Sequence, residues 1–453
     1  MTTAARSPFL ARIGLDRPPL RAWAMYDWAV SSMQTTIMAA VFPIFFVKVA
    51  SAGLPPGQGA ATLAVANAMA TIVITLLAPV LGALADHSAA KKRFLLAFVV
   101  LGATACAGMF AIDRGEVRLA SWLYALAMIG AQGSMAFYGA LLPHIARDEE
   151  MDRVSTAGYA IGYLGGGVLL AFNLWWIQSP ATFGLPHGTG MSAREATLPA
   201  RLAFVSVAAW WLLFSVPVLR HVPEPPARLE AGERPGQSVF VAPFVRLRNT
   251  LHELRGFRHA FLLLLAFLVY NDGISTIIKL ATAYGTEIGI PQGSLIAAIL
   301  VVQFVGIPCS IGFGALASRI GAKRAVMLGL CVYTVIAGLA YFMRTSAHFM
   351  MLALLVGTVQ GGTQALSRSL FAAMTPPERS GEFFGFYGVF EKFSGIFGPL
   401  LYAGTVALGG TSRTAILSVV VFFVAGLALL ARVDVAAGVA AARAAGRDPG
   451  ARG

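Results

Sequence analysis

Three acidic side chains lie well inside long apolar stretches of the sequence: Asp27, Asp272 and Glu391. A charged side chain at the centre of a bilayer costs about 2.5–3.5 kcal/mol even on lenient insertion scales, so it is retained mainly where it faces a cavity or a partner. Burial also disfavours the ionised form of a carboxyl group, which allows it to take up and release a proton. We therefore predict that these three residues couple proton movement to function.

Asp27 has a second interpretation, because it lies close to the predicted cytoplasmic end of its apolar stretch. A carboxylate near a helix start often caps the helix or makes a structural hydrogen bond. Both interpretations of Asp27 stay open at this point.

Other polar residues recur at spacings of three, four and seven, which place them on one face of a helix. These faces predict a polar path between helices. Its solute-binding residues are predicted to be Tyr26, Ser31, Gln34, Gln132, Asn271, Asp272, Lys279, Gln360, Gln364, Arg368 and Tyr387. The planar guanidinium of Arg368 suits a carboxylate, since it holds two oxygens and stays charged at any cellular pH. Alternatively, Arg368 neutralises Glu391 or Asp27 across the helices.

The elements that position these residues are membrane-spanning helices. The 453 residues are 57% hydrophobic and 12% charged, with a mean hydropathy of +0.72, whereas soluble proteins carry about 25% charged residues. Apolar runs long enough for a bilayer of about 30 Å start near residues 22, 59, 94, 119, 154, 202, 260, 293, 325, 348, 382 and 414. The runs lack the period of two that β-barrel strands show. We predict an all-α membrane protein with twelve transmembrane helices.

The net charge of +13 reports topology rather than nucleic-acid binding, which would need a basic patch on a soluble domain. Basic residues concentrate in the segments that begin and end the chain and in alternate loops between the apolar runs. By the positive-inside rule, both termini are cytoplasmic. We expect a multi-pass protein of the plasma membrane, surrounded by lipid and without a nucleic-acid partner.

The chain repeats itself after about half its length. Ala22 to Ser32 aligns without a gap on Ala266 to Thr276, and one long polar interval separates six apolar runs from six. This layout is typical of transporters in which two halves rock against each other. We predict five parts: a cytoplasmic segment 1–21, a six-helix bundle 22–220, a cytoplasmic linker 221–258 with an amphipathic helix, a second bundle 259–431 and a cytoplasmic tail 432–453.

A second repeat pairs Gly82-Ala83-Leu84-Ala85-Asp86, followed by Lys91-Lys92-Arg93, with Gly314-Ala315-Leu316-Ala317-Ser318, followed by Lys323-Arg324. The first copy resembles the cytoplasmic signature of the major facilitator superfamily, although Ala89 replaces its second glycine and Ser318 replaces the acidic residue in the second copy. The resemblance implies the major facilitator fold, with gating by Asp86, Lys91, Lys92 and Arg93.

A narrower resemblance runs along most of the chain. Its motifs are Tyr26-Asp27-Trp28-Ala29, Tyr270-Asn271-Asp272-Gly273, Gly361-Gly362, Gln364, Ser367-Arg368-Ser369, Gly385 with Tyr387, and Gly398-Pro399-Leu400. Together they resemble the vacuole-effluxer-like, or "unknown major facilitator", family. That resemblance implies amino acids as the solute. It also implies movement toward the cytosol, which in a bacterial plasma membrane is uptake, and facilitators of this layout usually act as single chains.

These observations predict a secondary active transporter that moves a small solute, most simply an amino acid, by alternating access coupled to protons. Export of cationic or amphipathic compounds is the alternative, since acidic residues could bind cations, and a transporter-like receptor is another. An enzyme is disfavoured, because no phosphate-binding Gly-x-x-x-x-Gly-Lys motif occurs and histidines are sparse. No cofactor or metal site is expected, since Cys106, Cys309 and Cys331 each stand alone.

Overall fold

The computed structural model describes residues 10, 15–87, 89–146, 148–224, 256–375 and 380–447. Every regular element among these residues is a helix, and they form twelve helical segments of membrane-spanning length. The prediction of an all-α fold is confirmed, and the helix count agrees with it.

The first six segments begin with a helix that changes type along its length. The elements are α2 (Pro18–Ser32), η1 (Met33–Ala40), α3 (Val41–Phe45) and η2 (Phe46–Ala50), then α4 (Gln58–His87), α5 (Lys91–Gly108), η3 (Met109–Ala111), α6 (Val117–Ile145), α7 (Asp148–Gln178), η4 (Pro180–Phe183) and α8 (Ala193–His221). Both η1 and η2 have π-helical hydrogen bonding, which occurs mostly as short stretches and frequently at functional sites.

The last six segments include two that are interrupted. The elements are α10 (Arg258–Glu287), α11 (Gln292–Ile320), α12 (Ala322–Tyr341), α13 (Ser346–Ala373), α14 (Ser380–Phe393), α15 (Phe397–Ala407), α16 (Ser412–Ser418) and α17 (Val420–Ala431), followed by α18 (Val435–Arg447). The break between α14 and α15 matters most for the site.

All twelve segments begin before the residue predicted from hydropathy. The largest difference is at α8, which begins at Ala193 rather than near residue 202. An apolar run measures the part of a helix that crosses the hydrocarbon, whereas backbone hydrogen bonding continues into the polar interface. At α8 the earlier start is stabilised by a capping box, in which Ser192 accepts from the N–H of Glu195 and the Glu195 side chain accepts from the N–H of Ser192.

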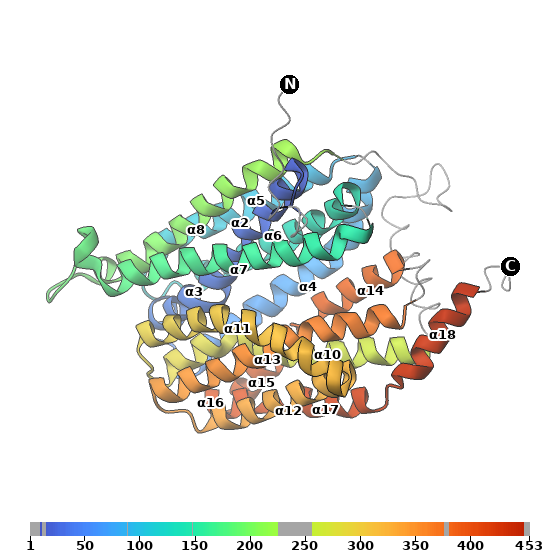
Figure 1. Ribbon diagram of the computed structural model, residues 1–453. Helices are drawn as coiled ribbons and strands as arrows, with labels where there is room; N and C mark the ends of the chain where they lie inside the picture. Colours follow the sequence, from blue (N-terminus) through green and yellow to red (C-terminus); the bar gives the residue numbers. More distant parts are fainter. Residues whose placement is uncertain are drawn as a thin grey trace. The chain divides into compact units, whose positions relative to one another are not determined.

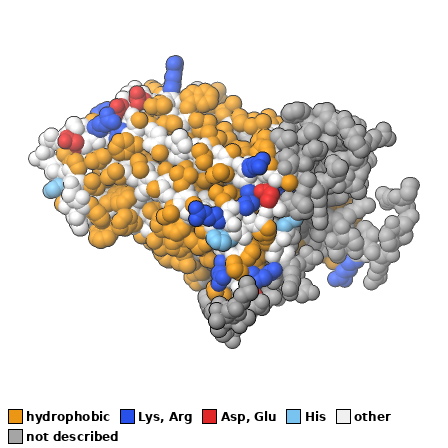
Figure 2. Space-filling view, turned by 90° about the horizontal axis from the view of Figure 1, so that it is seen from above, with side chains coloured by type: hydrophobic (Ala, Val, Ile, Leu, Met, Phe, Trp, Pro, Cys, Tyr) orange, Lys and Arg blue, Asp and Glu red, His pale blue; other side chains and the backbone are white. Residues whose placement is uncertain are grey.

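The described surface is that of a membrane protein. Ten helices are long and apolar enough to cross a membrane among the described residues. Large apolar side chains point outward, including Trp122 at 69%, Leu213 at 64% and Val421 at 61% exposure. Figure 2 shows hydrophobic side chains over most of the described surface on one face, with charged side chains in small groups. Such an apolar surface is stable in contact with lipid chains, whereas its exposure to water would be unfavourable.

The chain divides into two compact units. The first comprises Met1–Leu54 and Leu76–Val239, and the second comprises Pro55–Thr75 and Phe240–Gly453. Within the first unit α2 packs on α8, α5 on α6 and α5 on α8; within the second, α10 packs on α17, α12 on α13 and α12 on α17 (Figure 1). The internal sequence repeat therefore corresponds to a repeat of helix packing. The predicted boundaries at residues 220 and 259 stay a prediction.

Small residues allow α2 and α7 to approach closely within the first unit. A Cβ added at Gly165 would lie 2.6 Å from the backbone oxygen of Trp28, and one at Gly162 would lie 2.7 Å from Ser31 Oγ. Glycines commonly serve this purpose between membrane helices, where close backbone approach replaces the hydrophobic effect as the source of association. This packing brings Asp27 and its neighbours against α7.

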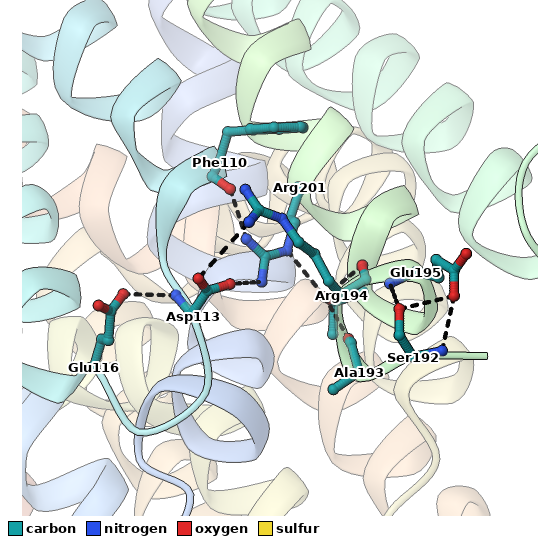
Figure 3. Close-up of polar contacts among 9 residues, drawn as sticks. Phe110, Asp113, Glu116, Ser192, Ala193, Arg194, Glu195 and Arg201 are labelled. Carbon is teal, nitrogen blue, oxygen red and sulfur yellow. Dashed lines mark hydrogen bonds and ion pairs between the residues drawn. The ribbon is translucent and has the colours of Figure 1, made fainter.

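A buried arginine ties α8 to the end of α5 and η3. Arg201 is 1% exposed, and its guanidinium donates to Phe110 O at 2.6 Å and to Asp113 Oδ1 at 3.1 Å. Figure 3 shows Arg201 and Arg194 both directed toward Asp113. In the second unit Arg413, at the start of α16, donates to Tyr341 O at the end of α12. Both units thus use an arginine to join their third and sixth helical segments.

The predicted linker helix falls on residues outside the described part of the chain, apart from residues 221–224 and 256–258 at its ends. The tail does contain a helix, α18, whose Gly438 packs against Met374 and His259. Asp434 begins this helix by accepting from the N–H of Ala437 at 3.0 Å.

The Arg201 contacts predict a specific loss of stability. Replacing Arg201 with Met keeps most of the side-chain volume but removes its charge-assisted hydrogen bonds, so we expect the free energy of unfolding to fall by about 2 kcal/mol. The measurement is unfolding in mixed detergent micelles followed by circular dichroism. Arg194→Met is the matched control, because its contact to Asp113 is 3.9 Å long and exposed, and should cost less than about 1 kcal/mol. Equal losses in both variants would contradict this assignment.

Candidate functional site

The second unit contains an interrupted helix. The helix α14 ends at Phe393 and α15 begins at Phe397, and between them Gly395 has a φ of +136°, which only glycine adopts without strain. Such a break leaves backbone N–H and C=O groups without their helical partners at membrane depth. These groups need other partners, and in transporters the breaks commonly surround the solute and its coupling ion.

Asp272 meets the amino-terminal end of α15. Its carboxylate accepts hydrogen bonds from the N–H of Phe397 at 2.9 Å and of Gly398 at 2.8 Å, and the residue is fully buried. A negative charge at this end of a helix is favoured by the unpaired N–H groups and by the helix dipole. Asp272 therefore stabilises the break, a role that its position in the sequence did not reveal.

Lys279 supplies the opposite charge beside the same break. Its Nζ lies 3.0 Å from the position that a Cβ on Gly395 would take, and it interacts electrostatically with Asp272. The two residues are seven apart on α10, and a spacing of seven places them on one face. The site thus combines the Asp272 carboxylate, which accepts from two backbone N–H groups, with the Lys279 ammonium group, which lies next to the non-helical backbone at Gly395.

Three amide side chains complete this cluster. Asn271 donates to Ser394 Oγ and accepts from Gln364 Nε2 at 3.5 Å. Asn67, from the part of α4 that belongs to the second unit, donates to Gly395 O at 3.3 Å. Its Oδ1 is buried and has no hydrogen-bond partner among the described residues. The predicted residues Asn271, Asp272, Lys279 and Gln364 therefore do meet at one place.

Asp27 lies in a different cluster, within the first unit. Its Oδ2 accepts from the hydroxyl of Tyr138 at 2.6 Å, and the ring of Tyr138 stacks on Trp23 with centroids 4.3 Å apart. Because α2 begins at Pro18, Asp27 lies in the third turn, so a capping role is excluded and a hydrogen-bonding role is observed. A Cβ at Gly158 of α7 would approach Asp27 Oδ2 to 2.6 Å.

The neighbours of Asp27 are also well packed. Tyr26 is fully buried and accepts from Trp211 Nε1 at 3.4 Å. Ser31 lies against Gly162, and Gln34 lies half-buried in the π-helical stretch η1. Tyr26 thus belongs to the core of the unit, whereas Gln34 keeps partial access.

The remaining predicted residues differ in their surroundings. Tyr387 is buried and stacks on Phe267 with centroids 4.5 Å apart, so its ring serves packing. Gln132 and Gln360 are half-buried, whereas Arg368 and Glu391 are exposed. Arg368 acts electrostatically on Glu391, in agreement with the alternative that the two neutralise each other. Lys392 acts on Glu391 in the same way.

The residues predicted for gating sit at the start of α5. Lys91 Nζ lies 3.3 Å from His144 Nε2, and the N–H of Lys92 donates to the carboxylate of Glu224 at 3.0 Å. Arg93 is exposed. The side chain of Asp86 lies outside the described part of the structure, so its gating role stays a prediction.

Sequence reasoning missed three polar residues. Asn67 is an amide side chain within a long apolar run, and that position in the sequence was the signal that could have identified it. Arg201 lay just before the predicted start of its helix. Glu287, at the end of α10, accepts from the N–H of Ala60 at 2.8 Å and from Ser412 Oγ, and so holds the starts of α4 and α16.

The tight fit at α15 yields a prediction for the break. A methyl group at Gly398 would collide with Thr276 Oγ1 and lie 2.8 Å from Asp272 Oδ1, so Gly398→Ala should displace the Asp272 cap. We expect a loss of about 1–3 kcal/mol in stability, measured by detergent unfolding, because overpacking has this cost. Gly404→Ala on the same helix meets nothing within 4 Å and should be close to neutral. If both variants unfold alike, the cap is not the cause.

Known proteins resemble the chain along most of its length. Residues 56–443 match the family described as vacuole effluxer Atg22 like. The chain is 37% identical over 413 residues to the uncharacterized MFS-type transporter YxiO of Bacillus subtilis (strain 168), covering 91% of this chain and 94% of that protein. It is 24% identical over 304 residues to autophagy-related protein 22-1 of Penicillium rubens, covering 62% of this chain and 49% of that protein. The chain thus spans about half the length of that fungal relative.

Solved transporters share the fold at low sequence identity. The xylose transporter XylE from E. coli, in an inward-open conformation, has a TM-score of 0.63 at 12% identity and covers 91% of this chain and 95% of its own. A bacterial homolog of the human lysosomal transporter Spinster has a TM-score of 0.62 at 12% identity, covering 95% and 97%. These relatives are transporters, not enzymes. The chain belongs to the vacuole effluxer Atg22-like family and has the fold of the major facilitator transporters.

Proposed function

We propose that the protein is a proton-coupled secondary transporter that takes up amino acids by alternating access. The observation that carries the proposal is the interrupted helix of the second unit, with Asp272 on its amino-terminal end and Lys279 beside Gly395. Helix breaks at membrane depth offer backbone groups to a solute, and such breaks surround the substrate in several transporter folds.

The charges around the break favour a zwitterion. The ammonium group of Lys279 suits a carboxylate, and Asn67 Oδ1, which has no hydrogen-bond partner in the described part of the chain, suits a primary ammonium group. Asp272 accepts from two backbone N–H groups but keeps its charge and further lone pairs, so it can add to the attraction for the ammonium group. The family description, a vacuole effluxer, supports movement toward the cytosol, which corresponds to uptake across a plasma membrane.

Asp27 is the proposed proton carrier. It is 7% exposed, and its Oδ2 accepts from the hydroxyl of Tyr138, a hydrogen bond that the carboxyl group can keep when its other oxygen carries a proton. Asp272 is the second candidate for proton coupling, because its complete burial favours the neutral form although its two N–H donors favour the ionised form. Glu391 is exposed and interacts electrostatically with Arg368 and Lys392, and we propose that it contributes to coupling by pairing with Arg368 in one conformation and releasing it in another.

The cellular setting forms part of the same proposal. Basic residues on alternate loops support a plasma-membrane protein with both termini on the cytoplasmic side. The packing repeat within each unit supports two bundles, 22–220 and 259–431, in one transporting chain. A single chain is proposed to be sufficient.

The test is transport by purified protein in liposomes. Entry of a labelled amino-acid mixture is measured with and without an inward proton gradient, against protein-free liposomes. We expect accumulation that requires the gradient. Entry that is unaffected by the gradient would contradict proton coupling, and no entry by folded, inserted protein would contradict the amino-acid assignment, leaving export of cationic compounds to be tested in inverted vesicles.

The roles of individual residues predict different defects. Asp27→Asn should lower gradient-driven accumulation at least tenfold yet retain exchange of solute across the membrane without a gradient, since only proton release is lost. Lys279→Gln and Arg368→Ala should instead raise the KM for the solute about tenfold. Each change removes a positive charge that could bind the carboxylate of the solute. Glu116→Gln, in the exposed loop before α6, is the control and should transport normally. Exchange lost together with accumulation in Asp27→Asn would overturn its role as a proton carrier.

A further inference from the structure

A tyrosine of α6 reaches the proposed proton carrier of the first unit. The hydroxyl of Tyr138 donates to Asp27 Oδ2 at 2.6 Å, and the two residues are only 3% and 7% exposed. A distance of about 2.5–2.7 Å is typical of a hydroxyl that donates to an ionised oxygen, and such a bond is roughly twice as strong as one between neutral groups. The contact therefore stabilises the ionised form of Asp27 more than the protonated form.

Contacts from α2 hold the ring of Tyr138 in place. The ring of Trp23 stacks on it with centroids 4.3 Å apart and an angle of 14° between the planes, and the ring of Tyr26 lies 4.9 Å away. The Trp23 indole N–H also donates to Tyr138 O at 3.0 Å. A tyrosine side chain rotates about only two bonds, so these contacts fix the position of its hydroxyl.

No charged side chain is recorded beside Asp27 among the described residues. The helix α7 faces Asp27 with Gly158 and Gly162, η1 contains no ionisable side chain, and α8 reaches the neighbouring Tyr26 through an indole N–H. Tyr26 is titratable, but a buried phenol stays neutral because burial disfavours its ionised form. Tyr138 is therefore the recorded polar partner that can favour one protonation state of Asp27 over the other.

The internal repeat shows that this pair belongs to the first unit. In the alignment of the two halves Asp27 corresponds to Asn271, whose neutral amide does not ionise. Asn271 donates to Ser394 Oγ and accepts from Gln364 Nε2. A carboxyl group that accepts from a tyrosine hydroxyl is thus found at the one of these two positions where proton binding is proposed.

We propose that Tyr138 is a positioning residue for proton release, whose hydroxyl holds the Asp27 carboxylate and sets the pH range in which Asp27 gives up its proton. The inference rests on the proposed role of Asp27 as the proton carrier. When Oδ1 of Asp27 is protonated, the hydroxyl keeps its bond to Oδ2, so Tyr138 itself neither gains nor loses a proton. The bond that breaks on release is the O–H bond of Asp27, and its proton passes to water.

The protonation of Asp27 can be followed without any solute. The full chain in detergent is titrated with acid and base while difference infrared spectroscopy records the C=O stretch of protonated carboxyl groups. The band that is missing in Asp27→Asn belongs to Asp27. In Tyr138→Phe, which keeps the ring, this band should disappear at an about tenfold lower proton concentration than in the unchanged protein, because a hydrogen bond to a charged group is lost.

Tyr284→Phe is the matched control. Tyr284 is also buried, and its hydroxyl donates to Ala340 O at 2.7 Å in the second unit, so the change removes a comparable hydrogen bond away from Asp27. It should move the midpoint less than twofold. Trp23→Leu keeps the Tyr138 hydroxyl but removes the stacked ring. It should move the midpoint in the same direction by a smaller factor, and it serves if Tyr138→Phe does not fold.

Transport in liposomes gives a second readout. Tyr138→Phe should lower gradient-driven accumulation severalfold at neutral internal pH, with the KM for the solute unchanged, and raising the internal pH by about one unit should restore it. A merely structural role would lower accumulation equally at every internal pH.

The outcomes separate this inference from the proposed function. An unchanged midpoint in Tyr138→Phe, or an equal shift in Tyr284→Phe, would overturn the role of Tyr138 and leave Asp27 as the carrier. If no band depends on Asp27, the carrier role itself is wrong and the inference is overturned with it.

Discussion

The hydrogen bonds from the N–H groups of Phe397 and Gly398 to Asp272 hold the second unit's site together. Without a carboxylate there, these two donors would face apolar surroundings unpaired, at a cost of several kcal/mol in a membrane. With it, the chain can stop one helix at Phe393 and start another at Phe397, so that Gly395, Ser394 and their neighbours present backbone and hydroxyl groups to Asn67, Asn271 and Lys279.

The two units share the same helix packing but contain different polar residues. Each packs its first segment on its sixth and its third on its fourth, and each joins the third to the sixth through an arginine that donates to a backbone carbonyl. The first unit keeps α7 continuous and places Asp27 against its glycines, under Tyr138. The second interrupts the equivalent helix. Shared architecture therefore supports two unlike polar clusters, one around Asp27 and Tyr138 and one around Asp272 and Lys279.

The ends of the helices show the same divergence. At the start of α5 the N–H of Lys92 donates to Glu224, whereas in the second unit Asp434 accepts from Ala437 of α18 and lines a cavity with Lys323 and Arg324. Duplicated halves often keep the helices that form the core, because packing tolerates little change. Their polar ends face solvent or lipid headgroups and are free to acquire separate partners.

The sequence by itself determined the class of protein, the twelve membrane segments, the two-fold repeat and the superfamily, because hydropathy and repeated motifs are local or linear properties. It also predicted which polar residues line a path through the protein, since charge inside an apolar run is costly. The contacts that each of these residues makes came only from the tertiary structure. Asp272 accepts from the N–H groups that begin α15, Tyr387 packs in an aromatic cluster, and Asn67, which the sequence analysis overlooked, donates to Gly395 O, while the predicted proton and solute roles of Asp272 and Tyr387 stay predictions. Such roles depend on which backbone groups lie within hydrogen-bonding distance, and that is set by helix breaks and close packing between residues far apart in the chain.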